Sequence, residues 1–440
     1  MVGNLRWARP CSRGKLRRHA LAPGSARANA NMAAISLAEA LARVLATPGG
    51  VMADESVPLS AAHGRHLAAA VIADEPWPTS DRSAMDGFAL AAGAGLPSGS
   101  ELQVVGESLA GHPFAGALPP GTAVRIMTGA LVPAGADTVV PVEVTSGFAS
   151  VRVTFTAAVQ PGQNIRRRGS EVQPGQVLLP PGTRIRAAEI GALAVLGRTQ
   201  VAVRQRPVVA ILATGDEIVP VAQQPAAHQV RESNSWALAA QVTESGGVPL
   251  RLGPAADAAP PLRAELQNGL QADVLLTIGG VSQGTHDLVH GLLAELGVAT
   301  IFHGIELKPG KPTLFGVARG HGRTTFVFGL PGNPASCFTV FDLLVRPLLQ
   351  RLLGQQPLPP GCGHLGGARW RANARLQAVP VRLRAGADGR LQAELRPGSP
   401  SGDPFALLGA DGYALLPANA QPDQLHTAGV VPYAAGTQLS

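Results

Sequence analysis

The fold is decided by residues 277–287, Thr277-Ile278-Gly279-Gly280-Val281-Ser282-Gln283-Gly284-Thr285-His286-Asp287. The apolar run 272–278 is typical of a fully buried strand, and the apolar residues of 288–296 have the spacing of a helix. Glycines let backbone N–H groups approach an anion, the Ser282 and Thr285 hydroxyls add donors, and a helix N-terminus favours phosphate. The stretch therefore predicts a phosphate-binding loop between a strand and a helix.

Asp287 does not belong to a simple phosphate cradle. An acid at the start of a helix can cap that helix. Beside phosphate it can instead hold Mg²⁺ or receive a proton. From the residues alone, both alternatives stay open.

On either side of this loop, strands alternate with helices, which predicts a doubly wound, mostly parallel sheet with right-handed crossovers. The expected strands are 208–212, 248–252, 272–278, 300–302 and 325–328, and the expected helices are 234–244, 260–270, 288–296 and 335–353. Polar or glycine-bearing segments follow nearly every strand, namely Thr214-Gly215-Asp216-Glu217, Asp257, 277–287, 308–312 and 329–334. Ligands bind at the carboxyl ends of such strands, so this edge is the predicted binding site.

Lysine is almost confined to one place. Of the 36 basic residues three are lysines, and apart from Lys15 they lie in Lys308-Pro309-Gly310-Lys311-Pro312. Two compact charges in a loop stiffened by proline indicate an anion site. Chance clustering on a surface loop is the alternative.

The N-terminal part of the chain has a different texture. We expect a helix at 36–45, with Ser36 as N-cap and Glu39 at the capping-box position, and a second helix at 61–70. From about 76 to 168, short β-type runs between glycine and proline turns predict a small β-rich module.

Three motifs of that module carry candidate site residues, each with a purely structural alternative. Asp81 and Asp86 lie in an acidic loop before a strand, where they act in a site or form Asx turns. Thr128 ends a strand and can donate to an anion or satisfy a turn. The arginines 166–168, followed by Glu171, form either a solvated face or a phosphate-facing corner.

The net charge of +7 does not indicate nucleic-acid binding. Residues 1–31 hold seven basic residues and no acid, which leaves 29 bases against 29 acids in the rest of the chain. The periodic pattern begins only at Ile35, after Met32. We expect 1–31 to be a disordered or misassigned extension. A targeting peptide is less favoured, since the segment has no apolar core.

The cysteines Cys11, Cys337 and Cys362 have neither zinc spacing nor the pattern of a disulfide framework, which favours a reducing cytoplasm. Hydrophobic residues make up 45% of the chain and charged residues 15%, as in globular proteins. No apolar run reaches the ~18 residues that a membrane span needs. We therefore expect a globular chain of several domains without a transmembrane helix.

Seven motifs, in this order, resemble those of the molybdopterin molybdenumtransferase family, to which the C-terminal domain of gephyrin also belongs. They are Ser-Ala-Met-Asp-Gly (83–87), Arg-Ile-Met-Thr-Gly-Ala (125–130), Asn-Ile-Arg-Arg-Arg-Gly (164–169), Thr-Gly-Asp-Glu (214–217), Gly-Gly-Val-Ser-x-Gly-x-x-Asp (279–287), Lys-Pro-Gly-Lys-Pro (308–312) and Leu-Pro-Gly-Asn-Pro (330–334). Molybdopterin adenylyltransferases carry a loop similar to 279–287, so the other six motifs make the match specific. The match runs from about Ile35 to the C-terminus.

The resemblance implies an elongated homodimer with four domains per subunit. They are a helical and β domain (32–76 plus 176–205), an inserted β-rich domain (77–175), an α/β molybdopterin-binding domain (206–354) and a C-terminal β-barrel (355–440).

The implied reaction inserts molybdate into adenylylated molybdopterin with Mg²⁺ and releases AMP. The implied further partners are the adenylyltransferase and recipient molybdoenzymes, with no nucleic acid and no membrane. The implied catalytic residues are Asp86, Thr128, Glu217, Asp257, Asp287 and Lys308, with Glu217, Asp257 and Asp287 also as metal ligands. The implied substrate-binding residues are Glu171, Thr214, Gly215, Gly279, Gly280, Ser282, Gly284, Lys311, Pro331, Gly332 and Asn333. In the dimer, Asp86 and Thr128 would reach the α/β site of the other subunit.

Three positions depart from the family pattern. Glu171 stands where some relatives have Asp. Gly304 stands where relatives often have a basic residue, so one anion contact is missing or His303 replaces it. The segment Ser399-Pro400-Ser401-Gly402 only loosely matches the family's serine-bearing turn.

Two other functions compete with molybdenum insertion. One is a molybdopterin adenylyltransferase, which uses the same α/β domain type and is disfavoured by the insert and the barrel. The other is a non-catalytic pterin-binding scaffold, which is disfavoured by the intact acids and lysines.

Overall fold

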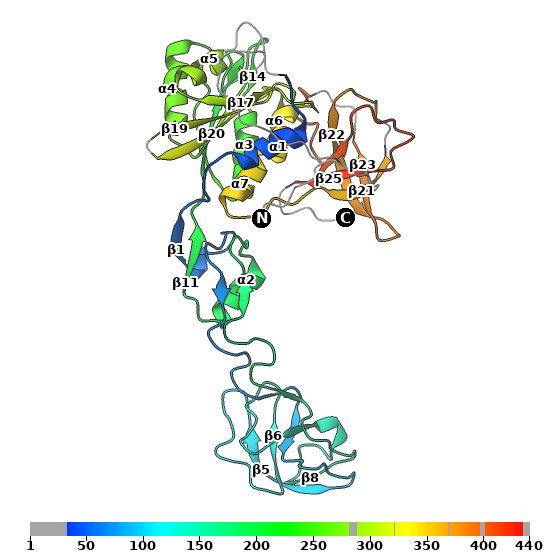
Figure 1. Ribbon diagram of the computed structural model, residues 1–440. Helices are drawn as coiled ribbons and strands as arrows, with labels where there is room; N and C mark the ends of the chain where they lie inside the picture. The colour runs from blue at the N-terminus through cyan, green and yellow to red at the C-terminus, as the bar shows by residue number, and fades with distance from the viewer. Residues whose placement is uncertain (1–32, 281–287, 321, 368–369, 397–400, 434–440) are drawn as a thin grey trace, which may run out of the picture. The chain divides into compact units, whose positions relative to one another are not determined.

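The computed structural model describes residues 33–280, 288–320, 322–367, 370–396 and 401–433 (Figure 1). Contacts divide the chain into two compact units. The larger unit holds the described residues of Met1–Ala68, Gly182–Ala187 and Gln200–Ser440, and the smaller unit holds Ala69–Pro181 and Ala188–Thr199. The division into four domains stays a prediction.

A six-stranded sheet with the order β15-β12-β16-β20-β19-β17 organises the larger unit. Its strands are β12 (Val208–Ala213), β15 (Val248–Arg251), β16 (Val274–Ile278), β17 (Ala299–His303), β19 (Leu314–Gly320) and β20 (Arg323–Leu330). The first four strands of this order are parallel, and β19 and β17 are antiparallel to their neighbours. The mostly parallel sheet is confirmed. The strand β19 was not predicted. It is antiparallel to both of its neighbours, so β17 runs in the same direction as β20.

Helices cover both faces of this sheet, so its strands are buried on both sides. Along β12, Val209 and Ile211 belong to one hydrophobic cluster, and Ala210 and Leu212 belong to the other. Residues of α1, α3, α6 and α7 pack in the first cluster and residues of α4 and α5 in the second. The helices are α1 (Leu37–Ala46), α3 (Asn234–Glu244), α4 (Ala259–Gly269), α5 (Leu288–Glu295), α6 (Pro334–Val340) and α7 (Arg346–Leu352).

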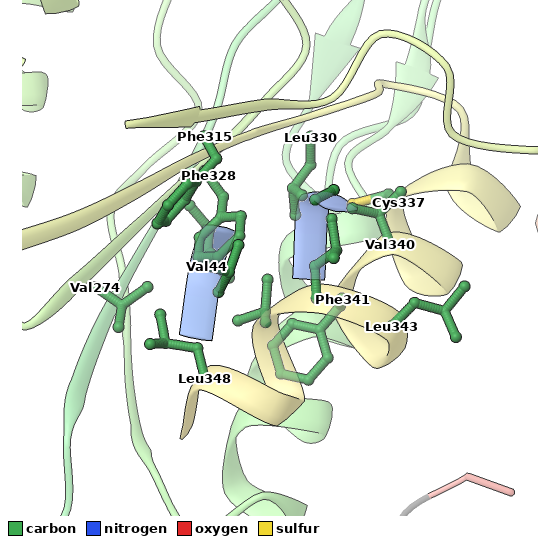
Figure 2. Close-up of a cluster of buried hydrophobic side chains, with 14 of the residues drawn as sticks. Val44, Val274, Phe315, Phe328, Leu330, Cys337, Val340, Phe341, Leu343 and Leu348 are labelled. Carbon is green, nitrogen blue, oxygen red and sulfur yellow. The ribbon is translucent and has the colours of Figure 1, made fainter. Parts of the chain in front are cut away.

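The first cluster joins segments that are far apart in the sequence. In Figure 2, the aromatic rings of Phe315 and Phe328 from the sheet lie beside Val44 of α1 and Phe341, which follows α6. The expected helix at 335–353 is confirmed, but it contains a π-helical turn, Phe341–Val345, between α6 and α7. Such turns often mark functional positions.

The C-terminal strands close into a barrel. They are β21 (Gly361–Gly367), β22 (Leu376–Ala385), β23 (Leu391–Leu395), β24 (Gly412–Leu416) and β25 (Thr427–Pro432). The order β22-β23-β21-β25-β24 closes through an additional pairing of β22 with β24, and β18 (Leu307–Lys308) joins the outside of β22. The expected C-terminal barrel is therefore present. Its strand β18 brings the lysine-bearing loop to the barrel.

The predicted helix at 61–70 is wrong. A three-residue 3₁₀ turn, Leu59–Ala61, ends there, and Gly64 has a φ of +74°, outside the helical region. His66 and Leu67 form isolated bridges with Arg184 and Val203 instead. Nearby, β1 (Asp54–Pro58) and β11 (Gln200–Arg204) form an antiparallel ladder.

The smaller unit is rich in β-structure, as the sequence predicts. Its main sheet has the order β7-β4-β6-β5-β8. The strands of that sheet are β4 (Gly87–Leu90), β5 (Glu101–Ser108), β6 (Thr122–Ile126), β7 (Thr138–Pro141) and β8 (Arg152–Thr154). The remaining elements are β2 (Val71–Ile72), β3 (Arg82–Ser83), β9 (Ile165–Arg166), β10 (Val177–Leu179), the 3₁₀ turn Val142–Val144 and α2 (Ala187–Val195). Alternate residues of β4 again face two cores, with Phe88 in one and Ala89 in the other.

None of the helices in the described part of the chain is long and apolar enough to cross a membrane.

Candidate functional site

The site begins where the winding of the sheet reverses. The chain passes from β12 through α3 to β15 on one side, and then through α4 to β16 on the other side of β12. Ligands of doubly wound sheets bind at this reversal, beyond the carboxyl ends of the strands. Here the Thr214 N–H donates to the Ile278 carbonyl at 3.0 Å, and the Gly279 N–H donates to the Leu330 carbonyl at 3.1 Å. The tips of β12, β16 and β20 are thus tied together.

Two glycines at the tip of β16 are required by the geometry. Gly279 and Gly280 have φ values of +87° and +59°. A Cβ at Gly279 would lie 2.9 Å from the Thr214 carbonyl oxygen, and a Cβ at Gly280 would lie 2.5 Å from Val289 Cγ2. Side chains cannot be accommodated here without movement, so backbone forms this wall.

A cavity of about 530 Å³ opens at these strand tips. We call it the glycine-lined cavity. Of the predicted site residues, those that line it are Thr214, Glu217, Gly279, Gly280, Pro331, Gly332 and Asn333. The Asn234 side chain at the start of α3 donates to the Gly332 carbonyl at 2.7 Å, which fixes the loop after β20. Gly215 lies next to the cavity wall, with a φ of +143°.

Acidic residues gather beside this cavity. The Asp257 N–H donates to Asp216 Oδ1 at 3.1 Å. Burial raises the pKa of the Asp257 carboxyl, and the nearby charges of Asp216 and Glu217 raise it further. Crowded carboxylates of this kind bind a hard cation or hold a proton. Among the described residues, however, no three His, Cys, Asp or Glu side chains form a ready metal site.

Three predicted residues, Ser282, Gly284 and Asp287, lie outside the described residues. Their proposed contacts with the metal or the substrate stay predictions.

A second cavity, of about 870 Å³, lies against the barrel. We call it the basic cavity, since Lys308, Lys311, Arg371, Arg375 and Arg396 line it. Gly310, with a φ of +124°, turns the chain between the two lysines. Five cationic side chains around one hollow provide a strong site for anions.

The two cavities adjoin. Pro312, Pro331 and Asn333 line both of them. The Asn333 side chain donates to Ser401 Oγ at 3.0 Å, so the loop after β20 is attached to the segment before β24. Glu217 and Lys308 therefore stand in neighbouring cavities that share a wall.

The barrel contributes three arginines to the site that no sequence motif predicts. Arg371 and Arg375 come from the segment before β22, and Arg396 directly follows β23. No motif surrounds them, and only the fold brings them to the lysine loop. The Arg375 guanidinium donates to the Leu307 carbonyl at 3.0 Å, which ties it to β18. His303, by contrast, lines neither cavity and packs against the ring of His290.

The other two predicted catalytic residues lie in the smaller unit and contact each other. Asp86 Oδ1 accepts hydrogen bonds from the Thr128 N–H at 2.6 Å and from the Thr128 hydroxyl at 2.7 Å. The backbone N–H and then the hydroxyl lower the pKa of Asp86. The carboxylate is thus held charged at a loop where β6 ends and β4 begins.

The arginine run of the smaller unit is largely paired with acids. Arg166 forms an ion pair with Glu171, and Arg167 forms one with Asp81 at 2.7 Å. Partial burial acts to raise the pKa of Asp81, but the Arg168 N–H and the Arg167 guanidinium outweigh it, so the pKa is lowered. Glu171 is therefore engaged by Arg166, and its role toward substrate stays a prediction.

Two family models match the chain. That for the MoeA N-terminal region (domain I and II) covers residues 35–197, and that for a probable molybdopterin binding domain covers residues 210–351. A molybdopterin molybdenumtransferase from Bacillus subtilis is 36% identical over 302 residues, which are 67% of this chain and 69% of the relative. The chain belongs to the molybdopterin molybdenumtransferase family.

Other members of the family extend the match. The molybdopterin molybdenumtransferase of Synechocystis is 31% identical over 370 residues, 83% of this chain and 91% of that protein. Two crystal structures of a molybdopterin biosynthesis MoeA protein from Pyrococcus horikoshii have TM-scores of 0.74 and 0.77, at 30% and 26% identity. Both cover 91% of this chain, and 99% and 100% of their own. Both cavities lie in the larger unit, and the strand tips at the glycine-lined cavity belong to the region that matches the molybdopterin binding domain.

Proposed function

We propose that this chain inserts molybdate into adenylylated molybdopterin and releases AMP, the molybdenum transfer step of molybdenum cofactor biosynthesis. One observation carries the proposal. The glycine-lined cavity and the basic cavity adjoin at Asn333, so a single elongated anionic substrate can occupy both.

The chemistry of the reactants accounts for this arrangement. Adenylylated molybdopterin carries a pyrophosphate and a dithiolene, and molybdate is a dianion, so negative groups must be brought together. The backbone at Gly279 and Gly280 lets the pyrophosphate approach the strand tips closely. The lysines and arginines of the basic cavity neutralise molybdate and hold it beside the dithiolene.

The acids near the glycine-lined cavity suit Mg²⁺ by their donor chemistry. Carboxylate oxygens are hard ligands, and Mg²⁺ in phosphate sites takes only one or two protein carboxylates together with substrate oxygens and water. Glu217 and Asp257 would hold the ion, together with Asp287. The raised pKa of Asp257 is consistent with this, since crowded carboxylates gain when a cation joins them. When bound, Mg²⁺ supplies positive charge that neutralises the pyrophosphate.

The protein's own groups then position the reactants and move protons. Asn333, held by Ser401, separates the phosphate end of the substrate from the molybdate end. Lys308 and Lys311 stabilise negative charge that builds up as molybdate exchanges an oxygen for sulfur. Before Mg²⁺ binds, the Asp257 carboxyl holds a proton more readily than usual, and it releases that proton as the ion takes its place.

The Asp86–Thr128 pair belongs to this proposal through a second copy of the chain. We propose that the protein works as a homodimer in which this pair reaches the α/β site of the partner subunit. A pre-formed pair whose carboxylate is kept charged suits a positioning role. The adenylyltransferase and recipient molybdoenzymes, in a reducing cytoplasm, complete the set of proposed partners.

The reaction itself provides the test. Purified protein is incubated with adenylylated molybdopterin, Mg²⁺ and molybdate, and nucleotide release is followed. AMP release that depends on molybdate supports the proposal. Formation of adenylylated molybdopterin from ATP and molybdopterin would support an adenylyltransferase instead. Binding of substrate without any turnover would indicate a scaffold.

A further inference from the structure

The chain contains two tyrosines, and both lie in one buried cluster behind the basic cavity. Tyr413 is on β24 and Tyr433 directly follows β25. Their rings meet edge to face, with centroids 5.1 Å apart, and Phe338 of α6 packs against Tyr433. The cluster therefore joins the barrel to the bent helix α6–α7.

The π-helical turn of that helix carries the cluster's acid. Asp342 is 2% exposed. Its Oδ1 accepts a hydrogen bond from Gln241 Nε2 at 2.7 Å and forms an ion pair with Arg346. Arg346 also donates to the Pro432 carbonyl of the barrel at 3.2 Å. Gln241 and Arg346 thus contact the same oxygen of Asp342, Oδ1, and neither contacts Oδ2.

Several polar atoms of this cluster lack a partner at full hydrogen-bond geometry within the described part of the chain. They are Gln241 Oε1, Asp342 Oδ2, Arg346 Nε, Tyr413 OH and Tyr433 OH. Buried polar atoms are usually paired, so orphan atoms that gather in one buried place call for a functional explanation. The charge of Asp342 acts on both tyrosine hydroxyls, so these three groups lie close together.

Thr339 connects this cluster to the basic cavity. It lies on α6, one turn before Asp342, and lines the cavity wall. Its hydroxyl donates to the Ala335 carbonyl at 2.6 Å, and its oxygen is beside the Tyr413 hydroxyl. A path of hydroxyl groups therefore runs from the cavity wall through both tyrosines toward Asp342.

Asp342 is suited to exchange a proton near neutral pH. Burial raises its pKa to about 7 against the opposing effect of Arg346 and Gln241, and the charge of Glu244 adds to the rise. From the barrel, the two tyrosines face it, and Asp411 acts on Tyr433. Burial also raises the pKa of both tyrosines, so they remain neutral and can relay a proton without holding it.

We propose that Asp342 is a buried proton-holding residue for chemistry in the basic cavity, connected to it through Tyr433, Tyr413 and Thr339. This inference rests on the proposed function. When molybdate binds a dithiol, two thiols lose two protons and one oxygen leaves as water. Asp342 holds one of these protons between the two events. Each relay hydroxyl gives up one proton as it receives another, so only Asp342 and the group in the cavity change charge.

The scarcity of tyrosine gives a direct readout. In protein labelled with ¹³Cζ-tyrosine, two NMR resonances report on the cluster without any substrate. We expect both to shift with a common midpoint near neutral pH, and Asp342→Asn to abolish the shift. Resonances that stay constant through neutral pH in the wild type would overturn the proposal.

Activity then tests the connection to the cavity. Tyr413→Phe removes the central hydroxyl of the path and keeps the ring, so the Tyr433 resonance should still titrate while the neutral-pH transition of the AMP-release rate is lost. Phe338→Leu is the matched control, since it disturbs the same packing without touching the path, and the transition should persist. Tyr413→Phe and Asp342→Asn variants that keep the wild-type pH profile would overturn the connection.

The two proposals fail in different ways. Absence of molybdate-dependent AMP release in the wild type rejects the proposed function. The NMR titration decides the proton-holding role by itself.

Discussion

The glycine-lined cavity and the basic cavity share a wall but are built by opposite means. The first is formed by strand tips, where glycine backbone and acids predominate. The second is formed by long cationic side chains from the lysine loop and the barrel. Backbone sites fix the position of a phosphate group, and flexible cations adapt to charge that changes during a reaction. The comparison suggests that the chain holds one end of its substrate rigidly and carries out chemistry at the other.

The largest expected effect is at the basic cavity. Lys308→Ala removes a point charge where negative charge develops, so molybdate-dependent AMP release should fall by about 10²–10³-fold. Arg390→Ala, which removes an exposed barrel arginine, is the control and should retain activity. Equal rates in both variants would mean that the basic cavity is not the reaction centre.

Gly280→Ala should distort the backbone wall of the glycine-lined cavity. The added Cβ would meet Val289 Cγ2 at 2.5 Å in a backbone of positive φ, so stability should fall by ~1–3 kcal/mol. Substrate affinity, measured by calorimetry, should fall as well. Gly253→Ala is the matched control, because no atom lies within 4 Å of a Cβ there. Unchanged affinity in Gly280→Ala would show that substrate does not bind at these strand tips.

Asp257→Asn tests whether a cation binds beside the glycine-lined cavity. Removal of one carboxylate should raise the Mg²⁺ concentration for half-maximal AMP release on the order of 10-fold. It should also remove the repulsion between this carboxyl and those of Asp216 and Glu217. A Mg²⁺ dependence identical to that of the wild type would exclude Asp257 as a ligand.

The smallest effect concerns stability rather than activity. The folded-state pKa of Asp342 is raised, so the folded protein keeps a proton that the unfolded chain loses first. The stability that this proton provides is complete below the ordinary pKa of 3.8 and is lost as pH rises toward about 7. Urea unfolding at several pH values should show this decline in the wild type. In Asp342→Asn the decline should be weaker, and an equal decline would contradict the assignment.

Local patterns predicted the sheet edge well. Buried strands, glycine turns and helical spacing are all evident within short windows of sequence. Such windows were therefore enough to predict β12, β16 and β20 and the glycines that follow these strands. The prediction of a helix at 61–70 was wrong because this segment pairs with residues far away in the sequence, as Leu67 does with Val203 of β11. A short window of sequence does not contain those partners. The antiparallel strand β19, which lies between β20 and β17, was not predicted for the same reason.

Only the lysines of the basic cavity could be predicted from the sequence. Lys308 and Lys311 were evident from the rarity of lysine, whereas Arg375 and Arg396 are brought there by closure of a barrel that starts after residue 355. The proton-holding cluster was not predicted at all, since Asp342 and Tyr413 are 71 positions apart and no motif marks either. Tertiary closure, not local sequence, creates these sites.

A crystal structure with adenylylated molybdopterin would decide whether one substrate spans both cavities. We expect continuous density for one molecule, with its pyrophosphate at Gly279 and Gly280 and its dithiolene past Asn333, beside Lys308. Density confined to one cavity, or bound elsewhere on the chain, would contradict it.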